Sequence, residues 1–136
     1  MIRKLVLVLS LVVLVGTVAG CGSSPKVVTK AQYQKELQRL GSNLNVGKFQ
    51  DGLDQAAKDL KHLKPPANVE ATNKRLANAF SELSKGLEAV KEARRKSIFK
   101  ARDALGVVGR SAAIKDGRAA VQDLKSKGYE VGELGL

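Results

Sequence analysis

VEATNKRLANAFSELSKGLEAV, residues 69–90, has the most regular apolar pattern in the chain. Its large apolar residues recur at intervals of seven, four, three, four and three, and they are Val69, Leu76, Phe80, Leu83, Leu87 and Val90. This heptad-like spacing places all of them along one face of an α-helix. A helix with such a face needs neighbours, because packing supplies most helical stability. The segment therefore predicts an all-α protein in which this helix packs against others.

The signals on either side of this segment set its limits. Pro65 and Pro66 precede it, and a residue before proline is kept out of the α conformation. Asn68 is then predicted to cap the helix. At the other end we place a turn at Ser97, which could cap a new helix. An apolar face then continues, and glycines mark a second possible break near residues 106–110. The residues assigned to that face are Ile98, Ala101, Leu105, Val108 and Ala112.

The segment before the double proline also has helical periodicity. Thr29 and Gln32 match a capping box, with a hydroxyl at the N-cap and a glutamine three residues later. Apolar residues then recur at helical spacing up to residue 63. We predict two helices, at residues 30–44 and 48–63, although a single kinked helix fits the pattern nearly as well. The residues of this pattern are Tyr33, Leu37, Leu40, Leu44, Phe49, Leu53, Ala56, Ala57, Leu60 and Leu63.

The end of the last helix has a strong local signal. Gly128 suits the position after the helix, where it would adopt a left-handed conformation, and Tyr129 would pack on Leu124 in a Schellman motif. Residues 130–136 are predicted to be a loosely held tail. No segment shows sustained alternation of apolar and polar residues. The predicted fold is thus an antiparallel bundle of three to four helices over residues 30–129.

Residues 1–21 contain the parts of an export signal in their usual order. Arg3 and Lys4 provide a positive start, residues 5–15 are mostly apolar, and small residues follow. The segment ends in Val18-Ala19-Gly20-Cys21, and Cys21 is the only cysteine. A lone cysteine cannot form an intramolecular disulfide or a cysteine-based zinc site. This segment therefore predicts an exported protein.

The quartet Val18-Ala19-Gly20-Cys21 resembles the lipobox of bacterial lipoproteins. In that family a peptidase recognises the three residues before the cysteine and cuts there, and the cysteine thiol carries a diacylglycerol. The resemblance implies that residues 1–20 are a cleaved signal peptide and that residues 21–29 form a lipidated tether. Acylated Cys21 would then hold the protein in membrane lipid, on the extracytoplasmic side of the cell membrane.

Three other interpretations of this segment remain. Residues 5–20 could form a transmembrane helix, but 16 residues fall short of the roughly 20 that span a bilayer. The segment could be an ordinary secretory signal, in which Cys21 has no role. Cys21 could also be a buried thiol, which the following Gly-Ser-Ser-Pro sequence disfavours.

Further motifs carry a second resemblance. After the tether come a first helix that opens with Tyr33, the sequence LKPPANV at residues 63–69, and KGYEVG at residues 127–132. Together they resemble small helical lipoproteins of actinobacteria-type envelopes. That resemblance implies a tethered helical domain and transfers no active site. Relatives hold a histidine shortly after the double proline, where this chain has Thr72 and Asn73.

The residues needed for catalysis or metal binding are scarce. His62 is the only histidine, and its place at a helix end favours a solvated side chain over a proton carrier or metal ligand. The chain has no phosphate-binding loop, no nucleophile elbow and no dinucleotide fingerprint. We therefore predict a protein that is not an enzyme and has no catalytic residue, metal site or cofactor.

The strongest surface signal is a basic cluster, formed by Lys91, Arg94, Arg95, Lys96, Lys100 and Arg102. Removing residues 1–20 leaves 22 basic and 13 acidic residues, a net charge of +9. The cluster could bind anionic lipid headgroups or acidic wall polymers, or it could be an ordinary solvated helical face. Nucleic acid is discounted as a partner because an exported protein rarely meets it.

Three functions fit the sequence. The first is a non-catalytic interaction module that docks another envelope protein through an exposed apolar patch. The second is electrostatic binding of an anionic surface through the basic cluster. The third is carriage of a small apolar ligand between helices, which rests on four small residues: Ala77, Ala79, Ala101 and Ala112.

Overall fold

The computed structural model describes residues 26–44, 49–132 and 134. Within these ranges every regular element is a helix. The elements are α1 (Lys30–Leu44), α2 (Phe49–His62), a 3₁₀ turn (Ala67–Val69), α3 (Glu70–Lys96), α4 (Ile98–Gly109) and α5 (Ala112–Ser126). The predicted all-α bundle is therefore confirmed.

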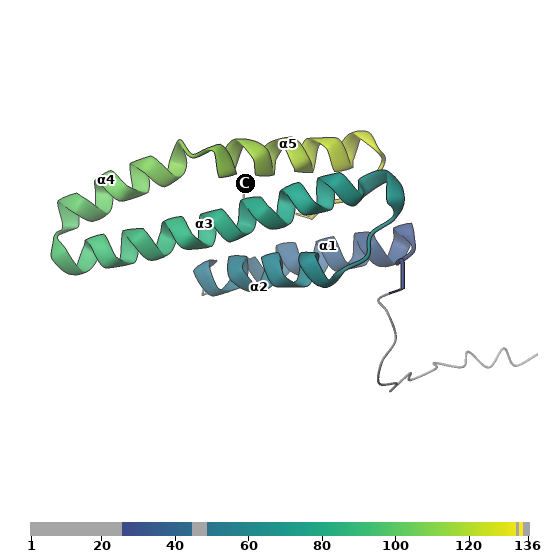
Figure 1. The fold of residues 1–136 in the computed structure, drawn as a ribbon, viewed down its shortest axis with the longest axis horizontal. Helices are drawn as coiled ribbons and strands as arrows, with labels where there is room; N and C mark the ends of the chain where they lie inside the picture. Colours follow the sequence, from purple (N-terminus) through teal and green to yellow (C-terminus); the bar gives the residue numbers. More distant parts are fainter. Residues whose placement is uncertain (1–25, 45–48, 133, 135–136) are drawn as a thin grey trace, which may run out of the picture.

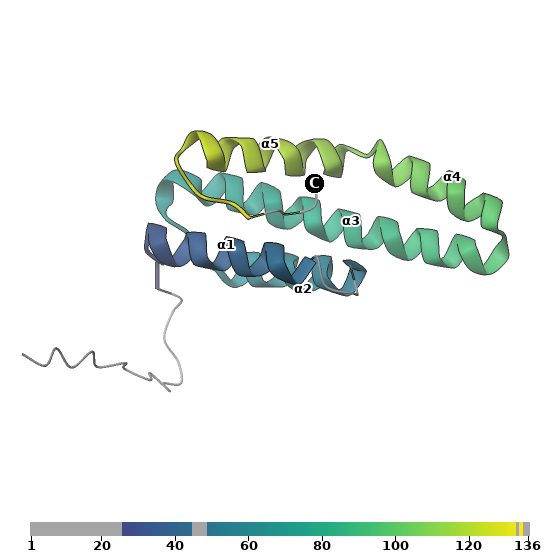
Figure 2. The same ribbon diagram turned by 180° about the vertical axis from the view of Figure 1, so that it is seen from behind.

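The long helix α3 runs through the molecule and carries a layer on each side (Figure 1). The pair α1 and α2 lies along one side of α3, and α4 and α5 follow one another along the opposite side. The reverse view in Figure 2 shows the same order, with α1 in front of α2. In both views α3 and α4 extend beyond the end of the α1–α2 pair. The bundle is thus four helices thick at one end and two helices thick at the other.

The first two helices follow the sequence prediction closely. Residues 30–44 and 49–62 form separate helices, so the two-helix interpretation holds among the described residues. Both hydrogen bonds of the capping box at Thr29 are present. The Thr29 amide donates to Oε1 of Gln32 at 2.9 Å, and the Gln32 amide donates to Oγ1 of Thr29 at 3.2 Å. Local side-chain chemistry therefore fixes where α1 begins.

The core lies in the four-helix half of the bundle. Its fully buried side chains come from α1, α2, α3 and α5, and the largest are Tyr33, Phe80, Leu37, Leu40, Leu53, Leu60, Leu76 and Leu124. The α3 seam changes along its length. Leu76, Phe80 and Leu83 are buried, whereas Leu87 and Val90 are only partly covered. The seam is thus fully buried from Val69 to Leu83, and its burial decreases beyond Leu83.

One polar network crosses this core. The Tyr33 hydroxyl donates to Oδ1 of Asn73 at 3.0 Å, and Nδ2 of Asn73 donates to the Leu60 carbonyl at 2.8 Å. The Tyr33 ring meets that of Tyr129 edge-on, with 5.7 Å between centroids. Burial, with a smaller contribution from Tyr129, raises the pKa of Tyr33 well above its usual range. The network therefore links α1, α2 and α3 at one point.

The start of α3 differs from the sequence prediction. Asn68 was expected to cap the helix, but the N-cap is Val69, and no side chain caps it. Asn68 instead lies in the 3₁₀ turn, where its Oδ1 accepts a hydrogen bond from the Tyr129 hydroxyl at 3.0 Å. The cap prediction was wrong because a distant tyrosine takes the side chain that local pattern assigned to the helix end.

The end of α5 has the predicted Schellman geometry. Gly128 has a φ of 73°, the Tyr129 amide donates to the Leu124 carbonyl at 3.0 Å, and the Gly128 amide donates to that of Lys125 at 2.9 Å. Only glycine adopts such a φ readily, so the chain reverses here. The predicted loose tail is wrong in part. Leu134 is buried in the core, because the reversal carries the chain back along the bundle, where Gly132 lies against the backbone of Gln38 on α1.

Candidate docking site at the α3–α4 end

The end of the molecule beyond α2 is a two-helix hairpin. The amide of Gln50, at the start of α2, donates to a carboxylate oxygen of Glu88 on α3. This hydrogen bond, more than the charge of Lys91, holds the pKa of Glu88 below its usual range. Past Glu88, α3 has α4 as its packing partner (Figure 1). We call residues 90–107 the hairpin end.

The turn at Ser97 shapes the hairpin end. Ser97 was predicted to cap a new helix, and its hydroxyl does accept a hydrogen bond from the Phe99 amide at 3.2 Å. The cap starts α4 immediately after α3, so Ile98 and Phe99 fall in the first turn at the extremity of the bundle. Ile98 is 67% exposed and Phe99 is 75% exposed. The sharp turn thus puts two large apolar side chains into solvent.

Further along α4 the apolar exposure continues. Leu105 is 53% exposed and Val107 is 65% exposed, and Ala101 is the buried residue of this helix. A shallow depression of about 390 Å³ lies among these side chains. It is lined by Val90, Ile98, Phe99, Ala101, Arg102 and Leu105. Such contiguous apolar exposure is typical of a contact surface.

These residues correct one prediction and extend another. Ile98 and Leu105 were assigned to a continuing apolar face, and the structure leaves both exposed because α1 and α2 do not reach this far. Phe99 and Val107 had no predicted role. The signal for them was present in the sequence: adjacent apolar residues such as Ile98 and Phe99 lie about 100° apart on a helix, so one narrow packing face cannot cover both.

The predicted basic cluster lies on this same end. Lys91, Arg94, Arg95 and Lys96 occupy the last turns of α3, and Lys100 and Arg102 lie on α4. All six side chains are exposed. The two halves of the cluster therefore lie on either side of the turn at Ser97, next to Ile98 and Phe99 in the chain.

Ion pairs within the protein neutralise only part of this positive charge. Lys91 pairs with Glu88 at 3.5 Å and Arg95 with Glu92 at 2.6 Å. Among the described residues, the other four have no ion pair: Arg94, Lys96, Lys100 and Arg102. Residues 90–107 hold six basic and two acidic side chains, a net charge of +4. The hairpin end therefore combines unpaired cations with exposed apolar groups.

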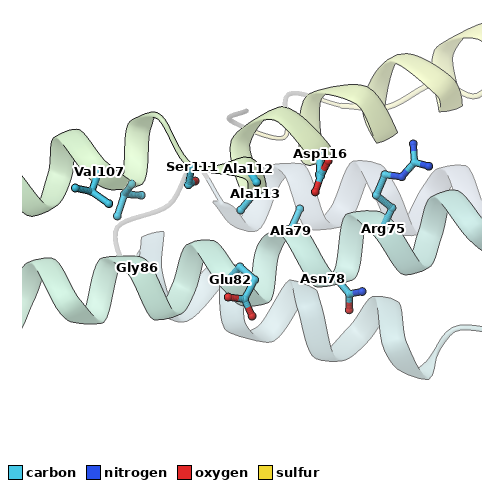
Figure 3. A pocket seen from close by; sticks show the side chains of 11 residues that line it. Arg75, Asn78, Ala79, Glu82, Gly86, Val107, Ser111, Ala112, Ala113 and Asp116 are labelled. Atoms are coloured by element: carbon cyan, nitrogen blue, oxygen red, sulfur yellow. The ribbon is translucent and has the colours of Figure 1, made fainter.

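A second hollow lies between α3 and the junction of α4 with α5 (Figure 3). It measures about 410 Å³ and opens to solvent, with Val107 and Gly86 at one end and Arg75 and Asp116 at the other. Ala79 and Ala112, two of the residues suggested for a ligand cavity, line it, whereas Ala77 lies in the core and Ala101 at the hairpin end. Its charged residues carry both signs, so its chemistry selects no ligand class.

The remaining predicted site residues lie elsewhere. His62 is exposed at the last residue of α2. In the part of the chain that the structure describes, no three side chains of histidine, cysteine, aspartate or glutamate lie close enough to hold a metal ion. No helix there is both long and apolar enough to cross a membrane. Val18, Ala19, Gly20 and Cys21, with the signal peptide and most of the tether, lie outside the described residues.

Comparison of the chain with models of protein families, with curated proteins and with solved structures gave no match.

Proposed function

We propose that this protein is an envelope lipoprotein without catalytic activity that acts as a docking module. Acylated Cys21 would hold it in the cell membrane on the extracytoplasmic side, and the hairpin end would make the functional contact. The observation that supports this contact is the coincidence of exposed Ile98 and Phe99 with the unpaired cations around them. Surfaces of this composition are more typical of contact sites than of solvated faces.

The position of the hairpin end supports this role. The chain enters the bundle at Lys30, at the opposite end of the molecule from the α3–α4 turn (Figures 1 and 2). The 27 residues of α3 give a separation of roughly 40 Å, at 1.5 Å per residue. An anchor at one end and a contact surface at the other leave the two attachments free of each other.

Lipid attachment is tested at Cys21 itself. We expect an alkyne-labelled palmitate, supplied to producing cells, to appear on the parent protein and not on a Cys21→Ser variant. The parent should also migrate faster in gels than the variant, because the variant retains residues 1–20. Equal labelling of the two proteins would contradict acylation at Cys21.

Docking is tested by the accessibility of position 99 in cells. If Cys21 is acylated, a cysteine introduced by Phe99→Cys is the only free thiol in the chain. We expect a membrane-impermeant maleimide to label it at least tenfold more slowly in intact envelopes than in the purified 22–136 chain. Lys61→Cys, at an exposed site on the opposite end, is the control and should label equally in both. Equal rates at position 99 would contradict docking, whatever the partner.

A further inference from the structure

We infer that the hairpin end docks on an anionic lipid bilayer, with Ile98 and Phe99 inserted at the interface and the cations on the headgroups. The inference names the occupant of the surface proposed above and therefore rests on that function. Its support is the combination of two chemistries at one projecting end. Apolar groups at the tip suit acyl chains, and the cations beside them suit phosphate groups.

The shape of the hairpin end favours a fluid partner. Ile98 and Phe99 lie exposed in the first turn of α4, at the turn of the two-helix hairpin, and no other element of the described residues covers them. A protein partner would need a socket shaped to receive a convex end. A bilayer interface needs no such socket, because lipids rearrange around an inserted side chain. Helical segments with aromatic and aliphatic groups beside lysine and arginine bind this interface in general.

The charge of the hairpin end points the same way. Arg94, Lys96, Lys100 and Arg102 have no acidic partner among the described residues, and the end carries a net charge of +4. A polyanionic wall polymer could neutralise these cations, but its polar backbone offers nothing to a phenyl ring. An anionic bilayer satisfies both groups at once, since it presents negative charge at its surface and hydrocarbon beneath.

The anchor geometry allows both attachments in one membrane. The Val28 amide donates to the Lys64 carbonyl at 2.9 Å, which fixes the tether to the bundle at that residue. Residues 21–27 can span at most about 25 Å, at 3.3–3.6 Å per residue. A bundle that lies along the membrane therefore brings the hairpin end to the surface. Tethering also raises the local concentration, so a weak contact suffices.

Insertion is measured with a Phe99→Trp variant of the 22–136 chain. The chain has no tryptophan, so this residue is the only one to report. The fragment contains every residue of the described core, and circular dichroism checks that each variant is folded. We expect a blue shift of the emission with vesicles of phosphatidylglycerol and phosphatidylcholine at a 1:3 ratio, and quenching by brominated acyl chains. Lys61→Trp, at the other end, should show neither.

The charge requirement is measured by co-sedimentation with the same vesicles. Glutamine at Arg94, Lys96, Lys100 and Arg102 should weaken binding by at least tenfold, because each surface cation contributes roughly fivefold. A matched control removes four exposed cations at the opposite end and should bind as the parent does; its positions are Lys35, Lys61, Lys64 and Lys125. Binding of the parent should fade with added salt and be absent with phosphatidylcholine alone.

Three results would overturn the inference. One is an unshifted Phe99→Trp emission at low salt while position 99 remains protected in cells, because docking would then stand with a protein or a wall polymer as the partner. Another is salt-sensitive binding to vesicles without quenching by brominated lipid, which would show surface attraction without insertion. The third is equal loss of binding in the two charge variants, which would remove any role for the hairpin end. Equal labelling rates at position 99 in intact envelopes and in the purified chain would instead remove the proposed function.

Discussion

The Tyr33 hydroxyl joins three helices through a single hydrogen-bonded chain. It donates to Asn73, whose amide in turn donates to the Leu60 carbonyl. Phenylalanine would keep the ring and leave Oδ1 of Asn73 buried without a donor. We expect Tyr33→Phe to lower the free energy of unfolding by about 1–3 kcal/mol, the usual effect of leaving a buried polar group unsatisfied. Urea unfolding followed by circular dichroism measures this.

A matched control exists in the second tyrosine. The Tyr129 hydroxyl donates to Asn68 in a partly buried position, where water can replace it. Tyr129→Phe should therefore cost less, about 0.5–1 kcal/mol. If both variants were as stable as the parent, the network would not contribute to stability as described.

The Tyr33 hydroxyl also makes the free energy of unfolding depend on pH in the alkaline range. Burial raises the pKa of Tyr33 above the unfolded value near 10. Below pH 10 the folded and unfolded states both keep the Tyr33 proton, and the contribution of Tyr33 to the free energy of unfolding is fully present. As pH rises past 10, the unfolded chain loses the proton first, so stability falls by up to about 1.4 kcal/mol per pH unit.

Tyr33→Phe should remove this part of the pH dependence. Unfolding midpoints in urea at pH 9, 10 and 11, compared between parent and variant, measure it. Deprotonation of lysines affects both proteins, so the difference between them isolates Tyr33. Parallel curves over this range would show that the folded state ionises Tyr33 as readily as the unfolded chain.

At the scale of elements, the contact between α3 and α4 depends on Gly86. A Cβ added there would lie 2.9 Å from Cγ2 of Val108, closer than side-chain contacts allow. Alanine in a helix normally adds up to about 1 kcal/mol over glycine. We expect Gly86→Ala to lower the free energy of unfolding by about 1 kcal/mol despite the higher helix propensity of alanine, because α4 must move outward. Thermal and urea unfolding measure the change.

The cause of that loss is tested by two further variants. In a Val108→Ala background the obstacle is removed, so Gly86→Ala should become stabilising, with a coupling of about 1 kcal/mol or more between the two sites. Gly106→Ala on α4 is the matched control, since its added Cβ would meet only the flexible guanidinium of Arg110. It should stabilise by up to about 1 kcal/mol. Additive effects at positions 86 and 108 would contradict the close packing.

The sequence predicted those element boundaries that local chemistry determines. The capping box of Thr29 and Gln32, the cap at Ser97 and the turn at Gly128 need only residues within a few positions of each other. The break near 106–110 was likewise marked by glycines, and α4 ends there at Gly109. Each of these signals satisfies backbone groups at a helix end, so it can be found without the fold.

Features that depend on distant partners could not be predicted in this way. Asn68 has the chemistry of a cap, but Tyr129, 61 positions away, uses it as an acceptor. Leu134 belongs to a sequence that suggests a loose tail, and it is buried only because the chain returns along the bundle after α5. The basic cluster was visible in the sequence, but the apolar tip within it was not. Whether Ile98 is covered depends on where α2 begins, which its own neighbours do not encode.

At the scale of the whole molecule, the two ends differ in what holds them together. The end near the start of α1 has a core to which four helices contribute, and the hairpin end has one helix pair around Val90 and Ala101. Local opening is easiest where few apolar contacts must break. We therefore expect amides of α4 and of α3 beyond Glu88 to exchange through local opening, at least about 2 kcal/mol below the global free energy of unfolding. Hydrogen exchange at residue resolution measures this.

The same hydrogen-exchange experiment also tests the proposed contact with a bilayer. If the hairpin end inserts into an anionic bilayer, bound lipid covers the apolar side chains that α1 and α2 do not reach. Adding phosphatidylglycerol vesicles should then slow exchange in α4 and the last turns of α3 by at least tenfold, because a ligand that binds the closed form suppresses opening. Exchange in α1 and α2 should not change. Protection spread evenly over the chain would instead mean that vesicles stabilise the whole bundle. Without vesicles, equal opening free energies in both halves would show that α3 and α4 alone form as cooperative a unit as the four-helix half.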